Sequence, residues 1–411
     1  MKKIAIIGSG ISGLTCAYHL AGNFDISVFE KADYIGGHTH TVHVTTAEEE
    51  VDIDTGFIVF NDRTYPNFIK LMDEIGVEYQ PTEMSFSVRN DACNLEYNGH
   101  SLSTLFAQQS NIFRLRFLLM LNEIVRFNRD VRRELQAQSH TTIGEYLAVQ
   151  KFSLLFQQNY LLPMISAIWS MGLQKSNDFP LQFFARFFAN HGLLDITGRP
   201  QWYTIKGGSS NYITPLTRFF SDRIRLNTPV TKVIRGDDSL SVITDKGSER
   251  FDEVIFACHG DQALKLLAEP TTDEKNILRN FLFSDNRVIL HTDASVLPRR
   301  KRAWASWNYR VIGEEKSRPT LTYNMNILQR LQTKNTYLVS LNQDIEDKAI
   351  LQEFNYSHPV YSSESIAAQQ QWQTISGRDR IHFCGAYWQN GFHEDGVDSA
   401  LRVCSMFKET A

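Results

Sequence analysis

Residues 3–13 read KIAIIGSGISG, and this stretch decides the fold. Its first five residues are mainly apolar and run directly into glycine, a pattern that predicts a short buried parallel strand. Gly8, Gly10 and Gly13 then have the GxGxxG spacing of a turn between a strand and a helix. A helical stretch and a second apolar strand, residues 26–29, follow. We therefore predict an α/β fold built on a parallel sheet.

Each glycine of this turn has a physical role in binding a dinucleotide. Gly8 makes the tight turn, Gly10 lets a pyrophosphate approach the backbone, and Gly13 lets the helix pack against the strand. The helix N-terminus offers free N–H donors to the phosphates. Glu30 ends the second strand at about the distance from Gly8 expected of an acid that binds a ribose. The predicted binding residues of this unit are Gly8, Ser9, Gly10, Ile11, Ser12, Gly13, Glu30 and Lys31.

The segment after the second strand resembles one superfamily of flavoproteins. Residues 30–38 read EKADYIGGH, which is similar to the acid and glycine pair of the amine oxidase, phytoene desaturase and protoporphyrinogen oxidase flavoproteins. In that superfamily the pair lets the backbone approach the phosphates of FAD, so the resemblance implies FAD. Arginine usually follows the pair, and this chain has His38 instead. The resemblance places Gly36, Gly37, His38 and Thr39 against the cofactor, and Thr55, Gly56 and Phe57 beside the flavin.

A block near the other end of the chain resembles the same superfamily. Residues 381–386 read IHFCGA and residues 391–397 read GFHEDGV, like the family's strand, loop past the flavin, and helix. We expect the helix to begin near Gly396 and its N-terminus to stabilise a reduced flavin by about 0.5–2 kcal/mol. An acidic residue usually follows the first glycine of the motif, and Ala386 stands there instead. The resemblance implies cofactor contacts from Gly385, Gly396 and Val397.

A third block lies in the middle of the chain. Residues 227–258 are predicted to form a strand, a hairpin and a buried strand. By resemblance, the backbone of Val230 lies against the adenine, and Cys258 at the end of the block is a further cofactor-binding candidate. Upstream, residues 206–212 (KGGSSNY) resemble the family's Gly-Gly segment, although a simple helix cap explains them equally well.

The three blocks imply a Rossmann-type FAD-binding domain assembled from discontinuous segments, plus a mixed α+β substrate domain with a helical insert. Runs at 287–291 and 336–341 are predicted strands of a sheet over the open face of the flavin. We assign residues 1–60, 205–285 and 375–411 to the FAD-binding domain, residues 61–204 and 286–374 to the substrate domain, and about 103–200 to the insert.

The region between about 60 and 204 reads as mostly helical. One of its predicted helices contains Phe183, Phe184, Phe187 and Phe188, and phenylalanine at helical spacing is more often core than ligand wall. In this superfamily, however, a helical insert builds the substrate cavity. The predicted helical stretches are 111–134, a capping-box start at 142–145, 161–171 and 181–190.

The resemblance implies hydride transfer to flavin N5, a reaction that needs few acid–base groups. Orientation of the substrate's C–H bond matters more. His291 and Asp293 are candidate catalytic residues, because strand alternation puts both side chains on one face. A surface histidine with a neighbouring acid is an equally good interpretation. His393, beside the flavin in the C-terminal block, is the third catalytic candidate.

Composition argues against several other classes of protein. A net charge of −4 does not favour nucleic-acid binding. The five cysteines are dispersed without a CxxC pair, so we expect a reducing, cytoplasmic location. No apolar run reaches the ~18 residues of a membrane span, and the apolar residues 4–7 run into the glycine turn rather than forming a signal peptide. Peripheral membrane contact stays open. The basic run 299–302 is a solvated loop or, less often, a contact for phosphate or lipid headgroups.

Three histidines, His38, His40 and His43, suggest a metal site. The glycine pair before them favours a flavin-facing strand instead, and no set of cysteines or carboxylates has metal-ligand spacing. We therefore predict no metal.

The main hypothesis is an FAD-dependent oxidoreductase that oxidises a C–N or C–C bond of a small-molecule or lipid substrate. Amine oxidation and lipid desaturation compete, with a slight preference for a bulky apolar substrate. One alternative is a non-catalytic binding protein, which the intact glycine turn disfavours. Another is a nicotinamide-dependent dehydrogenase, which the C-terminal motif disfavours. Non-covalent FAD is expected, because family geometry puts Cys384 nearer the phosphates than the ring. The electron acceptor stays open.

Overall fold

Five strands from distant parts of the chain form one parallel sheet in the computed structural model, which describes residues 1–135, 141–169, 176–195, 197–311 and 320–408. They are β1 (Lys3–Ile7), β2 (Asp25–Phe29), β10 (Ile224–Arg225), β14 (Glu253–Phe256) and β20 (Ile381–Phe383). Their order is β10-β2-β1-β14-β20, and every neighbouring pair is parallel. The predicted α/β fold with a sheet assembled from discontinuous segments is therefore confirmed, whereas the domain boundaries stay predictions.

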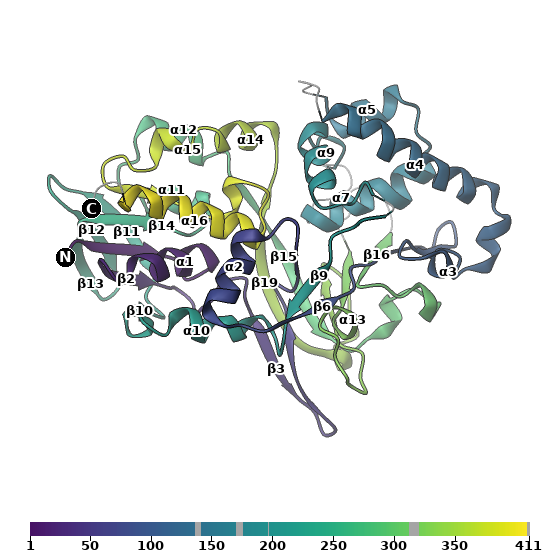
Figure 1. Cartoon of the computed structure of the whole chain (residues 1–411), viewed down its shortest axis with the longest axis horizontal. Helices are drawn as coiled ribbons and strands as arrows, with labels where there is room; N and C mark the ends of the chain where they lie inside the picture. The colour runs from purple at the N-terminus through teal and green to yellow at the C-terminus, as the bar shows by residue number, and fades with distance from the viewer. Residues whose placement is uncertain (136–140, 170–175, 196, 312–319, 409–411) are drawn as a thin grey trace.

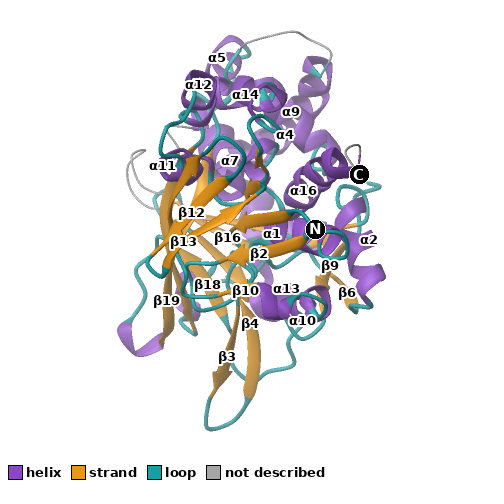
Figure 2. Ribbon diagram, turned by 90° about the vertical axis from the view of Figure 1, so that its left-hand side faces the viewer, coloured by secondary structure: helices purple, strands orange, loops and turns teal. Residues whose placement is uncertain are grey.

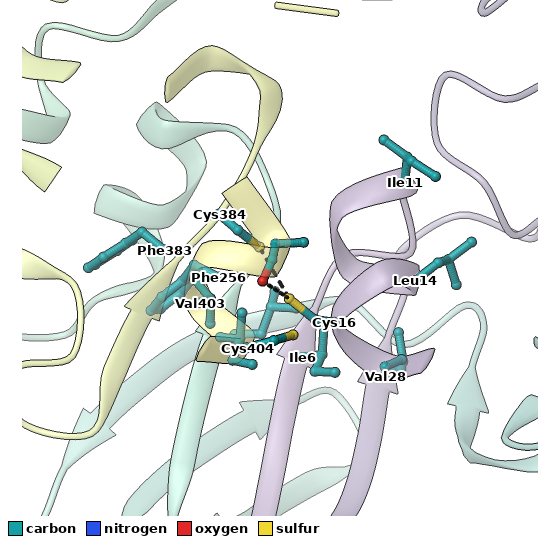
Figure 3. Close-up of a cluster of buried hydrophobic side chains, with 14 of the residues drawn as sticks. Ile6, Ile11, Leu14, Cys16, Val28, Phe256, Phe383, Cys384, Val403 and Cys404 are labelled. Carbon is teal, nitrogen blue, oxygen red and sulfur yellow. Dashed lines mark hydrogen bonds between the residues drawn. The ribbon is translucent and has the colours of Figure 1, made fainter. Parts of the chain in front are cut away.

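Two helices from opposite ends of the chain pack together beside this sheet. Helix α1 (Ile11–Leu20) follows β1, and α16 (His393–Lys408) begins three residues before the predicted start at Gly396. A Cβ built on Gly396 would lie 2.8 Å from Cγ2 of Ile11, so the contact between the helices requires glycine there. Figure 3 shows the core beneath them, where Cys16 and Cys384 approach each other among Ile6, Leu14, Phe256 and Val403.

A seven-stranded mixed sheet stands beside the parallel one. Its order is β19-β15-β18-β17-β16-β7-β8, and only β16 and β7 pair in parallel. The strands predicted at 287–291 and 336–341 belong to it. Its members are β7 (Phe86–Asn90), β8 (Leu95–Asn98), β15 (Leu282–His291), β16 (Trp307–Val311), β17 (Leu321–Asn324), β18 (Leu338–Leu341) and β19 (Ile350–Val360).

The expectation that residues 60–204 are mostly helical was wrong for the first part of that region. Residues 79–98 contain β6 (Tyr79–Thr82), β7 and β8. Strand β7 pairs with β16, more than 200 residues further along the chain, and β6 pairs with β9 (Trp202–Ile205). These short runs become strands because distant partners complete their hydrogen bonds, which local periodicity cannot reveal.

The helical insert is confirmed over the rest of the region. Thr142 and Glu145 form the predicted capping box, and α9 occupies the predicted residues. Of the helix expected at 161–171, Ser170 and Met171 lie outside the described residues. The insert shares an aromatic core with the mixed sheet, since Tyr97 of β8 and Tyr309 of β16 belong to the same cluster. It lies at the end of the molecule opposite both termini (Figure 1). Its helices are α3 (Leu102–Leu105), α4 (Leu115–Glu134), α5 (Ile143–Val149), α6 (Leu154–Phe156), α7 (Leu162–Trp169) and α9 (Leu181–Asn190).

The remaining elements surround the two sheets. The hairpin of β3 (Thr41–Thr45) and β4 (Glu50–Asp54) projects from the body of the molecule in both views (Figures 1 and 2). A three-stranded antiparallel sheet matches the predicted middle block and contains β11 (Val230–Arg235), β12 (Leu240–Thr244) and β13 (Gly247–Phe251). The others are β5 (Phe60–Asn61), α2 (Pro66–Ile75), α10 (Ile213–Thr217), α11 (Gly260–Leu266), α12 (Thr272–Leu278), α13 (Met325–Leu328), α14 (Ser363–Gln369) and α15 (Trp372–Ile375). Among the helices described, none is long and apolar enough to cross a bilayer.

Candidate cofactor site

The predicted cofactor-binding residues converge at one edge of the parallel sheet. Gly8 follows β1, Glu30 follows β2, Cys258 follows β14 and Gly385 follows β20. In open α/β sheets, ligands bind at the carboxyl ends of the strands. Helix α16, which contains Gly396 and Val397, starts at the same edge and packs on α1.

The glycine turn leaves space for a phosphate group. A Cβ on Gly8 would lie 2.7 Å from the Ala257 carbonyl oxygen, and one on Gly13 would overlap the Gly8 carbonyl oxygen. A Cβ on Gly10 would meet nothing within 4 Å, so the space over the turn is open. No side chain caps the N-terminus of α1, where Ile11 and Ser12 lie in the first turn. The turn therefore fits a diphosphate, which would accept hydrogen bonds from these N–H groups.

Glu30 holds the turn in shape. Its carboxylate accepts hydrogen bonds from the Ser9 amide (2.9 Å), the Ser9 hydroxyl (2.7 Å) and the Ala32 amide (2.8 Å). A carboxylate has about four acceptor positions, so one is left for the expected ribose. The Glu30 carbonyl also accepts from the Thr228 amide at 2.9 Å, which brings the start of β11 at Val230 close to this acid. Lys31, next in the chain, is exposed.

The second glycine pair lies directly against the first turn. Gly10 and Gly36 form a β-bridge, and the Gly36 amide donates to the Ser9 carbonyl at 3.1 Å. A Cβ on Gly37 would lie 3.2 Å from Cα of Gly10. The two glycine motifs therefore form one cradle.

His38, which replaces the usual arginine, lies within a group of other rings. Its Nε2 atom is buried and has no hydrogen-bond partner among the described residues. Its ring centroid lies 6.3 Å from that of His259, 5.6 Å from that of His358 and 5.5 Å from that of Tyr356. Burial lowers the pKa of His38, and lowers the pKa of His259 to about 4 and of His358 to about 3. These imidazoles are therefore neutral here.

A buried acid that sequence reasoning missed, Asp54, links the hairpin of β3 and β4 to residues 206–212. Asp54 is fully buried and accepts hydrogen bonds from the Thr41 hydroxyl (2.6 Å), the Ser209 amide (2.8 Å) and the Ser209 hydroxyl (2.9 Å). Burial raises the pKa of Asp54 to about 6, against these hydrogen bonds, which lower it. The segment 206–212 thus does more than cap a helix: it ties β4 to the glycine cradle.

Residues expected beside the flavin meet at one point. His393 Nε2 lies 3.0 Å from Thr39 Oγ1, and the imidazole stacks on Phe57 with a centroid distance of 3.5 Å. The Tyr212 hydroxyl, which the sequence did not single out, hydrogen-bonds to Thr39. Thr55 is held next to this point because its amide donates to the His40 carbonyl at 2.9 Å. Burial, and then the proximity of His38, lower the pKa of His393, which is neutral.

The Phe57 amide donates to the His38 carbonyl at 2.7 Å. A Cβ on Gly56 would overlap that same carbonyl. Residues 55–57, which follow β4, therefore pack against the backbone of His38, the residue directly after the second glycine pair.

Comparison with known proteins identifies the family. The model of the family described as flavin containing amine oxidoreductase matches residues 11–327, well over half of the chain. The chain belongs to this family. It is a flavin-dependent oxidoreductase of this family.

The chain is similar to three proteins of different printed activity. A 1-hydroxycarotenoid 3,4-desaturase from Flavobacterium sp. (strain P99-3) is 36% identical over 97 residues, which are 23% of this chain and only 18% of that protein. The cyclohexylamine oxidase of Brevibacterium oxydans IH-35A has a TM-score of 0.70, with 14% identity and 100% and 99% of the two chains covered. A fatty acid isomerase from P. acnes has a TM-score of 0.68, with 13% identity and 99% and 98% covered. At 13–14% identity, the likeness to these two structures shows that they and this chain have the same fold.

Within this amine oxidoreductase fold, His291 and Asp293 have structural contacts away from His393. His291 is fully buried, and its Nε2 lies 2.8 Å from the Ser340 hydroxyl. Its Nδ1 accepts from the backbone amide of Asp293. The Asp293 carboxylate accepts from the Ser295 amide instead of contacting the imidazole. Burial lowers the pKa of His291 to about 4. Their catalytic role stays a prediction, and each contact has a structural explanation.

A cavity of about 540 Å³ opens between the insert and the start of α16. Asp395 in its wall is buried, and burial raises its pKa to about 7. Its carboxylate accepts from the Phe392 amide at 2.8 Å. Glu394 accepts from the backbone amides of Asn67 (3.0 Å) and Phe68 (2.8 Å), which fixes the start of α2. The cavity is lined by Arg63, Thr64, Tyr65, Pro66, Ala189, Asn190, His191, Gln389, Asn390, Phe392, Glu394, Asp395 and Asp398.

Proposed function

We propose that this family member removes hydrogen from a C–C bond of a bulky apolar substrate, with FAD held non-covalently in the glycine cradle. The observation that carries the proposal is an aromatic wall, defined by Trp169, Phe183, Phe187, Tyr361 and Phe392, that joins the helical insert to the residue before His393. The type of reaction, oxidation of a small molecule by a flavin, is taken from the family.

The wall is continuous from the insert to the predicted flavin site. Phe187 stacks on Phe392 with a centroid distance of 5.1 Å, and Trp169 lies 4.8 Å from Phe187. Phe183 stacks on Tyr361 at 5.2 Å. Of these five rings only Phe392 lines the cavity, and the other four are buried behind it. An apolar chain placed against Phe392 would gain roughly 25 cal/mol per Å² of surface removed from water, which favours an apolar substrate.

Removal of hydrogen from a C–C bond yields a hydride and a proton. FAD, when bound, accepts the hydride at its N5 atom. The proton needs a base in the cavity, and Asp395 suits this role because its pKa of about 7 lets it accept a proton near neutral pH. Phe392, which lines the cavity in front of the other rings, would orient the C–H bond.

Amine oxidation is the second candidate. The carboxylates of Glu394, Asp395 and Asp398 line the cavity, and a surplus of negative charge attracts an ammonium group. Amine oxidases of the family often use a lysine near N5, and no lysine is among the described residues that line this cavity.

Non-covalent binding and a cytoplasmic location belong to the same proposal. Burial raises the pKa of the Cys258 thiol to about 12, which makes it a poor nucleophile. The Cys384 side chain is fully buried in the core, with its sulfur 3.9 Å from that of Cys16. All five cysteines are free thiols, which supports a reducing compartment.

Anaerobic reduction of the bound flavin tests the substrate class. The FAD-loaded protein is mixed with long-chain acyl lipids or carotenoids in one series and with primary amines in the other, and absorbance near ~450 nm is followed. Bleaching by the apolar series and a product with one more double bond support the proposal. Bleaching by amines alone replaces it with amine oxidation.

A further inference from the structure

We propose that the outer end of the helical insert is a docking face for an anionic lipid bilayer. The docking face consists of Leu102, Ile112, Phe113, Leu115, Leu118 and Leu119. It is separate from the cofactor site, and the inference does not depend on which substrate the enzyme oxidises.

Large apolar side chains gather on this end of the molecule. Phe113 is 88% exposed, Leu102 is 77% exposed and Leu115 is 69% exposed. Of the 14 exposed large hydrophobic residues in the described part of the chain, nine lie between residues 102 and 154. Single exposed apolar residues are normal on a soluble protein, whereas a contiguous group marks an interaction surface.

The start of α4 is apolar on both sides. Leu115, Leu118 and Leu119 have the i, i+3, i+4 spacing of one helix face and are exposed, whereas Phe117 and Met120 point into the core. Packing inside the insert therefore does not explain the outer face. Figure 1 shows α3 and α4 at the end of the molecule furthest from both termini.

Two basic segments border the docking face. Residues 97–122 contain no aspartate or glutamate, but they include Arg114 and Arg116. The short 3₁₀ helix Lys301–Ala303 packs against α3 and brings the basic run 299–302 beside Leu102. Arg116 and Arg302 form no ion pair with another described residue. An apolar face bordered by unpaired basic side chains is complementary to anionic lipid headgroups.

The shape also favours a bilayer. The apolar side chains occupy helix ends and a turn at a projecting end, where they can enter the soft boundary between headgroups and acyl chains. No described helix can span a membrane, so the contact would be peripheral. Within the basic run, Arg299 and Arg300 are paired with Asp91 and Glu96, so Arg302 is the residue assigned to the headgroup contact.

Vesicle flotation of the FAD-loaded protein tests the proposal. Vesicles of phosphatidylcholine alone are compared with vesicles that also contain phosphatidylglycerol. Wild type is expected to float with the anionic vesicles, and added salt is expected to weaken binding. The double variant Phe113→Ser/Leu119→Ser should bind at least tenfold more weakly. The variant Arg116→Glu/Arg302→Glu should lose the preference for anionic vesicles.

A matched control is the double variant Phe219→Ser/Leu282→Ser, which changes two side chains that are 64% and 60% exposed elsewhere. It should bind vesicles as wild type does. Unchanged FAD content and melting temperature establish that all variants are folded. The proposal is overturned if wild type binds neither vesicle, or if Phe113→Ser/Leu119→Ser binds as well as wild type. Sedimentation that shows a wild-type dimer, made monomeric by that variant without any vesicle binding, would assign the face to self-association instead.

Discussion

His393 Nε2 lies 3.0 Å from Thr39 Oγ1, although 354 positions separate the two residues in the chain. This hydrogen bond joins the first turn of α16 to the loop that follows the second glycine pair. Phe57 stacks on the same imidazole, so three distant segments meet at the place where the flavin is expected. The contact closes the site, and substitutions on either side of it should change cofactor binding and turnover together.

A substitution at Gly10 should change the affinity for the cofactor while leaving the fold nearly unchanged. Its φ is −68° and a Cβ there meets nothing, so Gly10→Val should fold with a loss of stability of no more than about 1 kcal/mol. The added side chain occupies the space over the turn, and FAD affinity should fall at least tenfold. Gly22→Val is the control, since Gly22 is also unhindered but lies at the far end of α1. Titration of the apo protein with FAD measures both variants, and normal affinity in Gly10→Val would refute the cradle.

The candidate histidines should behave differently. His393→Gln should reduce the rate of flavin reduction by tenfold or more, because it alters the contact with Thr39 at the place where the flavin is expected. His291→Gln should leave flavin reduction near wild type and lower stability by about 1–3 kcal/mol, the usual cost of disturbing a buried hydrogen bond. Stopped-flow reduction and thermal melts distinguish them. The opposite pattern would make His291 the catalytic residue.

Glu30 should stabilise the glycine turn itself, even before a cofactor binds. Glu30→Ala removes acceptors from both groups of Ser9, and hydrogen bonds to a charged acceptor contribute about 1.5–3 kcal/mol each. We expect weaker FAD binding together with a lower melting temperature in the apo protein. If FAD affinity falls while the apo protein melts as wild type does, Glu30 acts on the ribose alone.

Asp395 makes stability depend on pH. Its folded pKa of about 7 exceeds the value of about 3.9 in an unfolded chain. Between these values the folded state holds a proton that the unfolded state releases, so this group's contribution to stability is lost as pH rises from about 4 to about 7. The variant Asp395→Asn does not titrate at this position, so only the wild type loses this contribution. The free energy of unfolding of the variant minus that of the wild type should therefore increase from about pH 4 to about pH 7 by on the order of 2–4 kcal/mol.

Melts of both proteins across this pH range measure the difference. A constant difference would show that Asp395 is ionised throughout. The same variant should lose turnover, because the amide cannot accept the proton.

Much of the cofactor cradle can be predicted from local sequence. Gly8, Gly10 and Gly13 act within one turn, and Glu30 follows at a spacing set by a strand–helix–strand unit, so the pattern itself carries the geometry. The C-terminal block is similar, since a strand end and a helix start are both local features. The helix begins at His393 instead of Gly396 because the Gly396 amide already donates to the Phe392 carbonyl at 3.1 Å, and the Asp395 carboxylate accepts from the Phe392 amide.

The rest depends on contacts between distant segments. Asp54 binds Ser209 across 155 positions, and His38 meets His358 only because β19 crosses beside the glycine loop. Neither pairing has a signal in the local sequence. Strands β7 and β8 were missed for the same reason, and strand alternation suggested a link between His291 and the Asp293 carboxylate, whereas the contact is to the backbone amide.

The absorbance spectrum of the purified protein, reconstituted with FAD and then denatured and filtered, is the most direct measurement. Bands near ~370 and ~450 nm in the folded protein, with the colour passing the filter after denaturation, are the predicted result for a flavin held without a covalent bond. A protein that stays colourless after reconstitution would contradict the assignment of the cradle to FAD. Colour retained with the denatured chain would contradict non-covalent binding.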